Sequence, residues 1–173
     1  MKRVVVPRLI HFLGPSLLVG LYIKDNFQIV QVNGISMHPT IDHGDVLLGY
    51  KSSEYKVGDV ILLQSPTNGS LQIKRLISRN KVVLDPNSKF CKISTHHGII
   101  LPQGKLWVEG DFNSHSLDSN HYGPIPESCI VAKMTYNLFK RKAITSEMPI
   151  RYQYRLSKFK DLFIQHPWYF FYN

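Results

Sequence analysis

The stretch of sequence that decides the fold is VGDVILLQSPTNGSLQIKRLI, residues 57–77. It holds two short apolar runs, Val60–Gln64 and Leu71–Ile77, separated by the turn-forming residues 66–69, which read Pro-Thr-Asn-Gly. Apolar runs of this length that are bounded by Gly, Pro and Asn are typical of neighbouring strands. The stretch therefore predicts two strands joined by a turn.

The same pattern extends over the middle of the chain. Strands are predicted at residues 27–32, 46–50, 60–64, 71–77, 81–84, 106–109 and 129–136. Turn residues such as Gly44-Asp45 and Gly123-Pro124 separate them, and no amphipathic helix or internal repeat is visible. Short strands without intervening helices favour a mainly β fold built on an antiparallel sheet over alternating βαβ units.

Net charge is unevenly distributed along the 173 residues. The chain carries +9 overall, of which residues 1–24 contribute +4 and residues 140–173 contribute +5, so residues 25–139 are neutral. A nucleic-acid-binding domain normally carries a basic stripe on its folded body. Because the excess charge lies at the two ends and not on the body, we expect no nucleic-acid partner. The chain can fold around a core, since 43% of its residues are apolar.

Residues 4–23 are almost entirely apolar and follow the basic start Met-Lys-Arg. Twenty helical residues reach about 30 Å, the thickness of a bilayer's hydrocarbon core. A cleavable signal peptide should end in small residues, whereas this run ends in Tyr22-Ile23. We therefore predict that residues 4–23 form an uncleaved, single-pass membrane anchor in the lipid bilayer, and an ordinary buried helix is the alternative. A β domain at residues 25–139 and a basic, aromatic tail at residues 140–173 would follow.

Cysteine and histidine spacing predicts no metal site or cofactor. Cys91 and Cys129 lack metal-ligand spacing and leave the choice between two thiols and one disulfide open. His115, Asp118 and His121 are close in sequence, but no predicted helix brings them to one face.

Three segments carry groups capable of chemistry. The first, residues 33–40, contains Ser36 between a predicted strand and a Pro-containing turn. The second is the strand 71–77, where Lys74 shares a face with Leu76. The third, residues 110–125, is dense in hydrogen-bonding side chains and follows a predicted strand. Each alone is typical of a turn serine, a surface lysine or a capped loop.

Together the three segments resemble the ordered boxes of type I signal peptidases. The matching residues are Ser-Met-x-Pro-Thr at 36–40, Lys-Arg at 74–75 and Gly-Asp-x-x-x-x-Ser-x-Asp-Ser-x-x-Tyr-Gly-Pro at 110–124. The short chain, the predicted anchor and the sequence His-Ser-Leu-Asp-Ser at residues 115–119 most resemble the mitochondrial inner-membrane protease subunits. The resemblance covers residues 5–135 and implies the fold of that family.

The resemblance also implies the roles of individual residues. Ser36 would be the nucleophile, its backbone N–H an oxyanion donor, and Lys74 the general base, with Ser116 hydrogen-bonding Lys74 and Asp118 supporting the third segment. Lysine acts as a base only when neutral, so its pKa must fall by about three units from about 10.4. Burial beside apolar groups lowers a lysine pKa, and Leu76 with neighbouring strands would supply that cover.

The chain departs from the family pattern at three positions. Gly34 stands where bacterial relatives carry a Ser or Thr that provides the second oxyanion donor. Phe112 and Asn120 stand where many relatives carry Asn and Arg. Asn120 slightly favours the second mitochondrial subunit type over the first.

The resemblance implies a membrane-bound serine endopeptidase that removes sorting signals from precursor proteins in the mitochondrial intermembrane space. It also implies a hetero-oligomer with a related subunit at the inner membrane. Ile29, Ile35 and the residues preceding Lys74 are candidate walls of the substrate pocket. A bacterial-type signal peptidase and a non-catalytic, membrane-tethered β domain remain the alternatives.

The tail at residues 151–173 mixes basic and aromatic residues, and Leu156, Phe159 and Phe163 fall at helical spacing. Two interpretations are open for it. A basic amphipathic helix could lie against anionic lipid, or its aromatic face could dock on the domain or a partner subunit.

Overall fold

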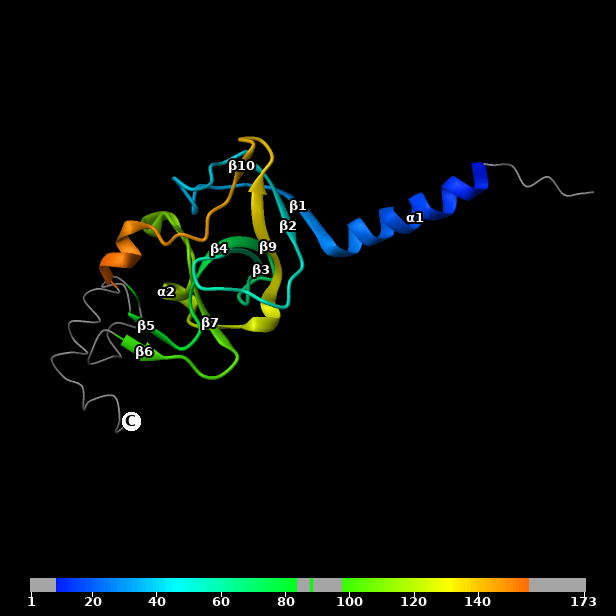
Figure 1. Ribbon diagram of the computed structural model, residues 1–173. Coiled ribbons are helices and arrows are strands. Elements are labelled where there is room, and N and C mark those ends of the chain that lie inside the picture. Colours follow the sequence, from blue (N-terminus) through cyan, green and yellow to red (C-terminus); the bar gives the residue numbers. More distant parts are fainter. Residues whose placement is uncertain (1–8, 84–87, 89–97, 156–173) are drawn as a thin grey trace, which may run out of the picture.

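The computed structural model describes residues 9–83, 88 and 98–155. An antiparallel sheet dominates them, which confirms the predicted mainly β fold (Figure 1). Its strands follow the order β1-β2-β9-β3-β4-β7-β8, and β10 pairs with β9. The strands of this sheet are β1 Phe27–Gln31, β2 Val46–Tyr50, β3 Val60–Gln64, β4 Leu71–Ser78, β7 Lys105–Glu109, β8 Ile125–Pro126, β9 Ile130–Asn137 and β10 Lys142–Ala143.

Smaller elements complete the domain. Strands β5 (Lys81–Val83) and β6 (Gly98–Ile100) form a separate hairpin. The one-turn helix α2 (Ser119–Tyr122) and two 3-10 turns, Asn113–His115 and Glu127–Cys129, lie between β7 and β9. The half-buried Cys129 has a free thiol, and Cys91 lies outside the described residues.

Strand β3 is buried on both faces, which explains its uninterrupted apolar sequence. Val60 and Leu62 pack into one core cluster, while Ile61 and Leu63 pack into a second cluster. Side chains alternate across a strand, so a strand covered on both sides needs apolar residues at every position. The central pairing of β3 with β4 and β9 thus holds the two halves of the core together.

The amino-terminal helix α1 (Leu9–Asn26) runs directly into β1 and projects away from the sheet (Figure 1). Its apolar side chains from Leu17 to Ile23 are largely exposed. Residues 4–8 of the predicted anchor lie outside the described residues. Within the described part of the chain, no helix has both the length and the apolar character required to span a membrane.

Residues 150–155 are helical and lie on the domain near the β5–β6 hairpin (Figure 1). Tyr152 packs against Ile77, Leu101 and Trp107 in a third core cluster. This packing agrees with the docking interpretation for the first residues of the tail. Leu156, Phe159 and Phe163 lie outside the described residues.

Candidate active site

Ser36 lies in the loop that follows β1, where buried apolar residues hold the backbone. Met37 and Ile41 are both buried, and the Ile41 N–H donates to the Met37 carbonyl at 3.0 Å. Gly34 adopts a φ of +119°, a backbone conformation that residues with a Cβ rarely adopt. The loop thus turns sharply at Gly34 and presents the half-buried Ser36 at its bend.

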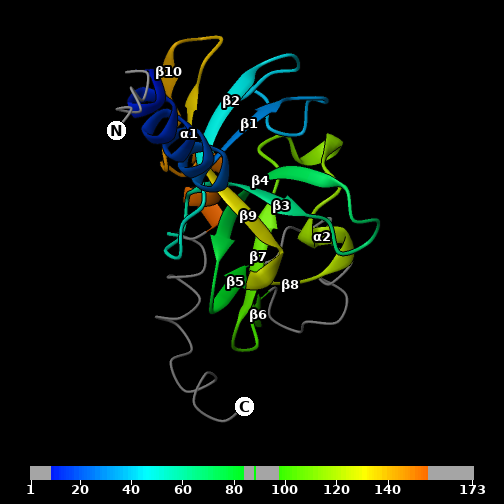
Figure 2. The same cartoon turned by 90° about the vertical axis from the view of Figure 1, so that its right-hand side faces the viewer.

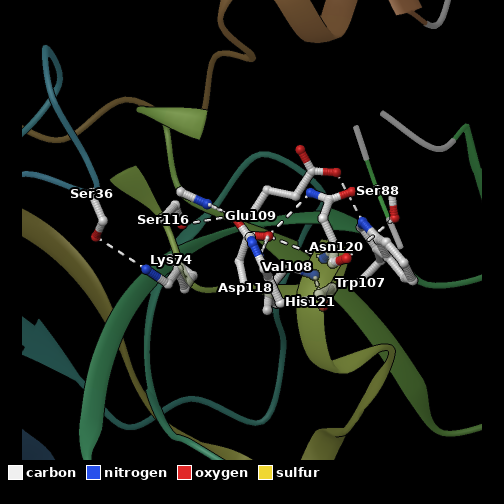
Figure 3. Close-up of polar contacts among 12 residues, drawn as sticks. Ser36, Lys74, Ser88, Trp107, Val108, Glu109, Ser116, Asp118, Asn120 and His121 are labelled. Atoms are coloured by element: carbon white, nitrogen blue, oxygen red, sulfur yellow. Dashed lines mark hydrogen bonds and ion pairs between the residues drawn. The ribbon is translucent and has the colours of Figure 1, made fainter. Parts of the chain in front are cut away.

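Lys74 approaches Ser36 from β4. Its Nζ donates to the Ser36 Oγ at 3.0 Å, as Figure 3 shows. The side chain is only 4% exposed and lies opposite the buried Ile61 of β3. A hydroxyl and an amine that lie 38 residues apart in the sequence are therefore within proton-transfer distance.

Burial changes the protonation of Lys74. Loss of hydration lowers its pKa from 10.5 to about 8, and the negative charges of Asp118 and Asp111 oppose that shift. A buried amine without an adjacent counter-charge favours its neutral form. Near pH 8 about half of the Lys74 side chains would be neutral and able to accept a proton.

The loop after β7 places Ser116 and Asp118 beside this pair. The Ser116 Oγ donates to Asp118 Oδ2 at 2.6 Å, and the same carboxylate accepts from the backbone N–H groups of Gly110 and Asn120 at 2.9 and 3.0 Å (Figure 3). Among the described residues Ser116 makes no hydrogen bond with Lys74, which differs from the expected contact. Ser116 donates its proton to Asp118 because an ionised carboxylate is a strong hydrogen-bond acceptor.

A buried ion pair next to Lys74 joins the three segments. Arg75 donates from Nε and Nη2 to the two carboxylate oxygens of Asp111 at 2.8 and 2.6 Å. Thr40, at the end of the Ser36 loop, donates to Asp111 Oδ2 at 2.6 Å. All three residues belong to the matching segments at 36–40, 74–75 and 110–124, but the sequence alone does not show that they contact one another.

Gly110 allows the third segment to contact the Ser36 loop. A Cβ at this position would lie 2.3 Å from the Ser116 Oγ and 2.5 Å from the Ser36 carbonyl oxygen. That carbonyl also accepts from the Phe112 N–H at 2.9 Å. Only glycine fits such a close approach, so the Ser36 backbone is held directly by residues 110–112.

The backbone around Ser36 offers one available N–H group. The Ser36 N–H donates no hydrogen bond to any part of the chain that the structure describes. Gly34 has no side chain, and its own N–H donates to His43 Nδ1 at 3.1 Å. The Ser36 N–H is therefore available to donate to a carbonyl oxygen placed beside Ser36, and residue 34 adds no hydroxyl.

A groove of about 290 Å³ runs beside Ser36 and Lys74. Ile29 and Ile35 do not line it, whereas residues 71–73, which precede Lys74, do. Ile29 is out of phase with the lining residues Val30 and Val32, so it projects from the exposed face of β1. The groove is lined by Val30, Gln31, Val32, Asn33, Gly34, Ser36, Met37, Leu62, Leu71, Gln72, Ile73, Lys74 and Leu117.

Histidine and acidic residues near the site do not form a metal centre. The His121 ring lies 3.8 Å from Asp118, and the His115 ring stacks on Phe112 with centroids 4.5 Å apart. Within the described ranges, no three His, Cys, Asp or Glu side chains are grouped as metal ligands would be.

Comparisons of the sequence with known proteins find peptidases. Residues 12–97 match a family described as Peptidase S24-like. The chain is 35% identical over 117 residues to mitochondrial inner membrane protease subunit 1 of Schizosaccharomyces pombe. The matched stretch covers 62% of this chain and 71% of that protein. It is 34% identical over 141 residues to subunit 1 of Xenopus tropicalis, covering 75% and 82%. Subunit 2 of Saccharomyces cerevisiae is 35% identical over 128 residues, covering 66% and 70%.

We expect the buried Arg75–Asp111 pair to contribute far more to stability than a surface pair. Replacing Arg75→Met leaves Asp111 charged and buried, which should lower the free energy of unfolding by about 3–5 kcal/mol. The matched control is Arg79→Met, because Arg79 pairs with Glu127 at 2.9 Å with both side chains more than a third exposed. Its loss should cost about 1 kcal/mol or less. Equal losses in urea denaturation would contradict this ranking.

Proposed function

Because the chain belongs to the family of the mitochondrial inner membrane protease subunits, we propose that it is a serine endopeptidase with a Ser36–Lys74 dyad. The observation that carries the proposal is the 3.0 Å contact between Lys74 Nζ and Ser36 Oγ. Serine is a weak nucleophile until an adjacent base takes its proton, and a buried lysine with a lowered pKa is such a base.

The proposed reaction begins when neutral Lys74 takes the Ser36 proton as Oγ attacks the scissile carbonyl carbon. The negative charge that develops on the carbonyl oxygen is met by the Ser36 N–H. Protonated Lys74 then gives its proton to the departing amine, which leaves an acyl-enzyme on Ser36. Lys74 next takes a proton from a water molecule that attacks the acyl carbon. As the bond between that carbon and Ser36 Oγ breaks, Lys74 returns the proton to Oγ, and the carboxyl product leaves.

Ser116 and Asp118 would support this reaction by fixing the loop after β7. Asp118 accepts hydrogen bonds from Ser116 and from two backbone N–H groups, and these donors stabilise its negative charge. The Ser116 oxygen keeps lone pairs after donating its proton. When Lys74 becomes protonated during the reaction, that oxygen is a nearby acceptor for it.

The substrate would bind as an extended strand in the groove. Within the described residues β1 pairs only with β2, and residues 71–74 pair only with β3. Both segments therefore offer free backbone groups on opposite sides of the groove, the arrangement used in strand addition. Val30, Val32 and Ile73 would select apolar side chains near the cut, a composition suited to sorting signals of precursor proteins.

We place the protein at the mitochondrial inner membrane, because the relatives are named for that membrane. Residues 4–23 would anchor it, residues 25–139 would form the protease domain in the intermembrane space, and residues 140–173 would form the tail. The relatives are named as subunits 1 and 2, so a related subunit is the proposed partner. Similar identities to both leave the subunit type open.

Separate Ser36→Ala and Lys74→Met substitutions should each abolish cleavage of a precursor, because each removes one half of the dyad. Cleavage is followed by mass spectrometry of the new amino termini, with circular dichroism to check folding. Ser53→Ala and Lys51→Met are the matched controls, since both residues are exposed. A Lys74→Met protein that still cleaves would refute the dyad.

The pH dependence of kcat/KM should follow the deprotonation of Lys74. The neutral base becomes more abundant as pH rises, so kcat/KM should increase about tenfold per unit well below the pKa and level off above it. With a Lys74 pKa of about 8, the midpoint is expected near that value. His38→Gln should leave the midpoint unchanged, and a midpoint near 6.5 that moves in this variant would indicate a histidine base instead.

Membrane association should depend on the apolar surface of α1. Leu17 and Leu18 are 65% and 68% exposed. Charging both with Leu17→Lys and Leu18→Lys should release the protein from membranes under carbonate extraction, because charges inside a hydrocarbon layer are costly. The matched control charges Leu138 and Phe139, an exposed apolar pair on the β domain. Retention of the α1 variant would argue against an anchor in this helix.

A further inference from the structure

Two side chains from the chain's last described residues donate to one backbone atom of the active-site loop. Arg151 Nη2 and Tyr152 Oη both donate to the Gly110 carbonyl, the latter at 3.1 Å. Arg151 Nη2 also donates to Tyr152 Oη, and its guanidinium lies 4.3 Å above the Tyr152 ring. One carbonyl thus receives a joined pair of donors from 41 and 42 residues further along the chain.

Gly110 is the residue through which the third segment reaches the nucleophile. Its Cα faces the Ser36 carbonyl, and the Phe112 N–H donates to that same carbonyl. Its own N–H donates to Asp118. Any displacement of the Gly110 peptide is therefore passed to Ser36 through direct contacts.

The segment that carries these donors is itself firmly docked. Tyr152 is 1% exposed and packs on Trp107. Arg155 pairs with the fully buried Glu109, with its Nη2 2.8 Å from Glu109 Oε1. Trp107 Nε1 donates to the same oxygen at 2.8 Å. A buried carboxylate without a cationic partner is unfavourable, so Glu109 holds Arg155 in place.

The beginning of the segment contacts the other side of the site. The Thr145 carbonyl accepts from Arg75 Nη1 at 3.2 Å, and the Ser146 Oγ donates to Asp59 at 2.5 Å. A Cβ on Gly58 would lie 2.0 Å from the Ser146 carbonyl oxygen, so the two backbones are in close contact. Residues 144–155, which we call the strap, thus touch Arg75 at one end and Gly110 at the other.

We propose that the strap positions the Ser36 loop for catalysis, with Tyr152 as a positioning residue that acts through the Gly110 carbonyl. This inference rests on the proposed protease function. Ser36 and Lys74 lie on separate elements, so their contact depends on how the third segment holds the loop. In enzymes a displacement of about 1 Å between reacting groups can lower the rate about 100-fold.

Tyr152→Phe tests the proposal because it removes one hydroxyl and keeps the buried ring. We expect kcat for a precursor peptide to fall about fivefold, the factor that corresponds to one ordinary hydrogen bond, with KM changed less than about twofold. Tyr154→Phe is the matched control, because Tyr154 is 59% exposed, and it should keep wild-type kcat. Adding Arg151→Met to Tyr152→Phe removes both donors and should lower kcat further.

Amide hydrogen exchange gives a second readout that needs no activity. In Tyr152→Phe the amides of residues 110–116 should exchange faster, while those of β3 and β9 keep wild-type rates. Wild-type kcat together with unchanged exchange would overturn the strap proposal. Faster exchange throughout the sheet would also overturn it, because the hydroxyl would then stabilise the whole fold. A wild-type protein that cleaves nothing would refute the protease function, and exchange would still decide the role of Tyr152.

Discussion

The buried ion pair between Arg75 and Asp111 is the interaction on which the site depends. Its guanidinium and carboxylate meet through two parallel hydrogen bonds, and Thr40 adds a third. Removing two charges from water is costly, so such a pair persists only where geometry and extra hydrogen bonds compensate. Here the compensation comes from β4, the loop after β7 and the end of the Ser36 loop. The three segments must therefore come together for the pair to form, and this brings Ser36 to Lys74. Strands β4 and β7, which lead to two of these segments, are neighbours in the sheet (Figure 2).

The same arrangement resolves an electrostatic conflict around Lys74. Its lowered pKa requires burial, yet two buried carboxylates, Asp111 and Asp118, lie close enough to raise that pKa. Among the described residues, neither carboxylate forms a hydrogen bond or ion pair with Lys74. Asp111 is neutralised by Arg75, and Asp118 accepts from Ser116 and two backbone N–H groups. The acids that build the loop are thus compensated locally, and burial remains the largest influence on Lys74.

The sequence predicted the strands well because turn residues mark their ends. The bounds of β2 and β3 agree with those predicted, each following a Gly-Asp turn. The strands that were missed, β6, β8 and β10, have two or three residues, too few to show alternation. Motifs nominated Ser36 and Lys74. The partner of Ser116 is a carboxylate two residues away in the same loop, whereas the burial of Arg75 depends on contacts with distant segments. Ile29 is exposed and does not line the groove beside Ser36, and its role in substrate binding stays a prediction.

Charge counted by segment also missed pairs that cross segment boundaries. The body at residues 25–139 is neutral by count and the tail carries +5, which suggested a separate basic tail. In the folded chain, tail residue Arg155 neutralises the buried Glu109, and Lys140 pairs with Asp42 and Asp45 at 2.6 and 3.0 Å. Part of the tail's charge is thus the counterpart of acids in the body. Glu109 is buried at the end of β7, beside the loop that holds Asp111 and Ser116, and its cationic partner Arg155 comes from the helical start of the tail.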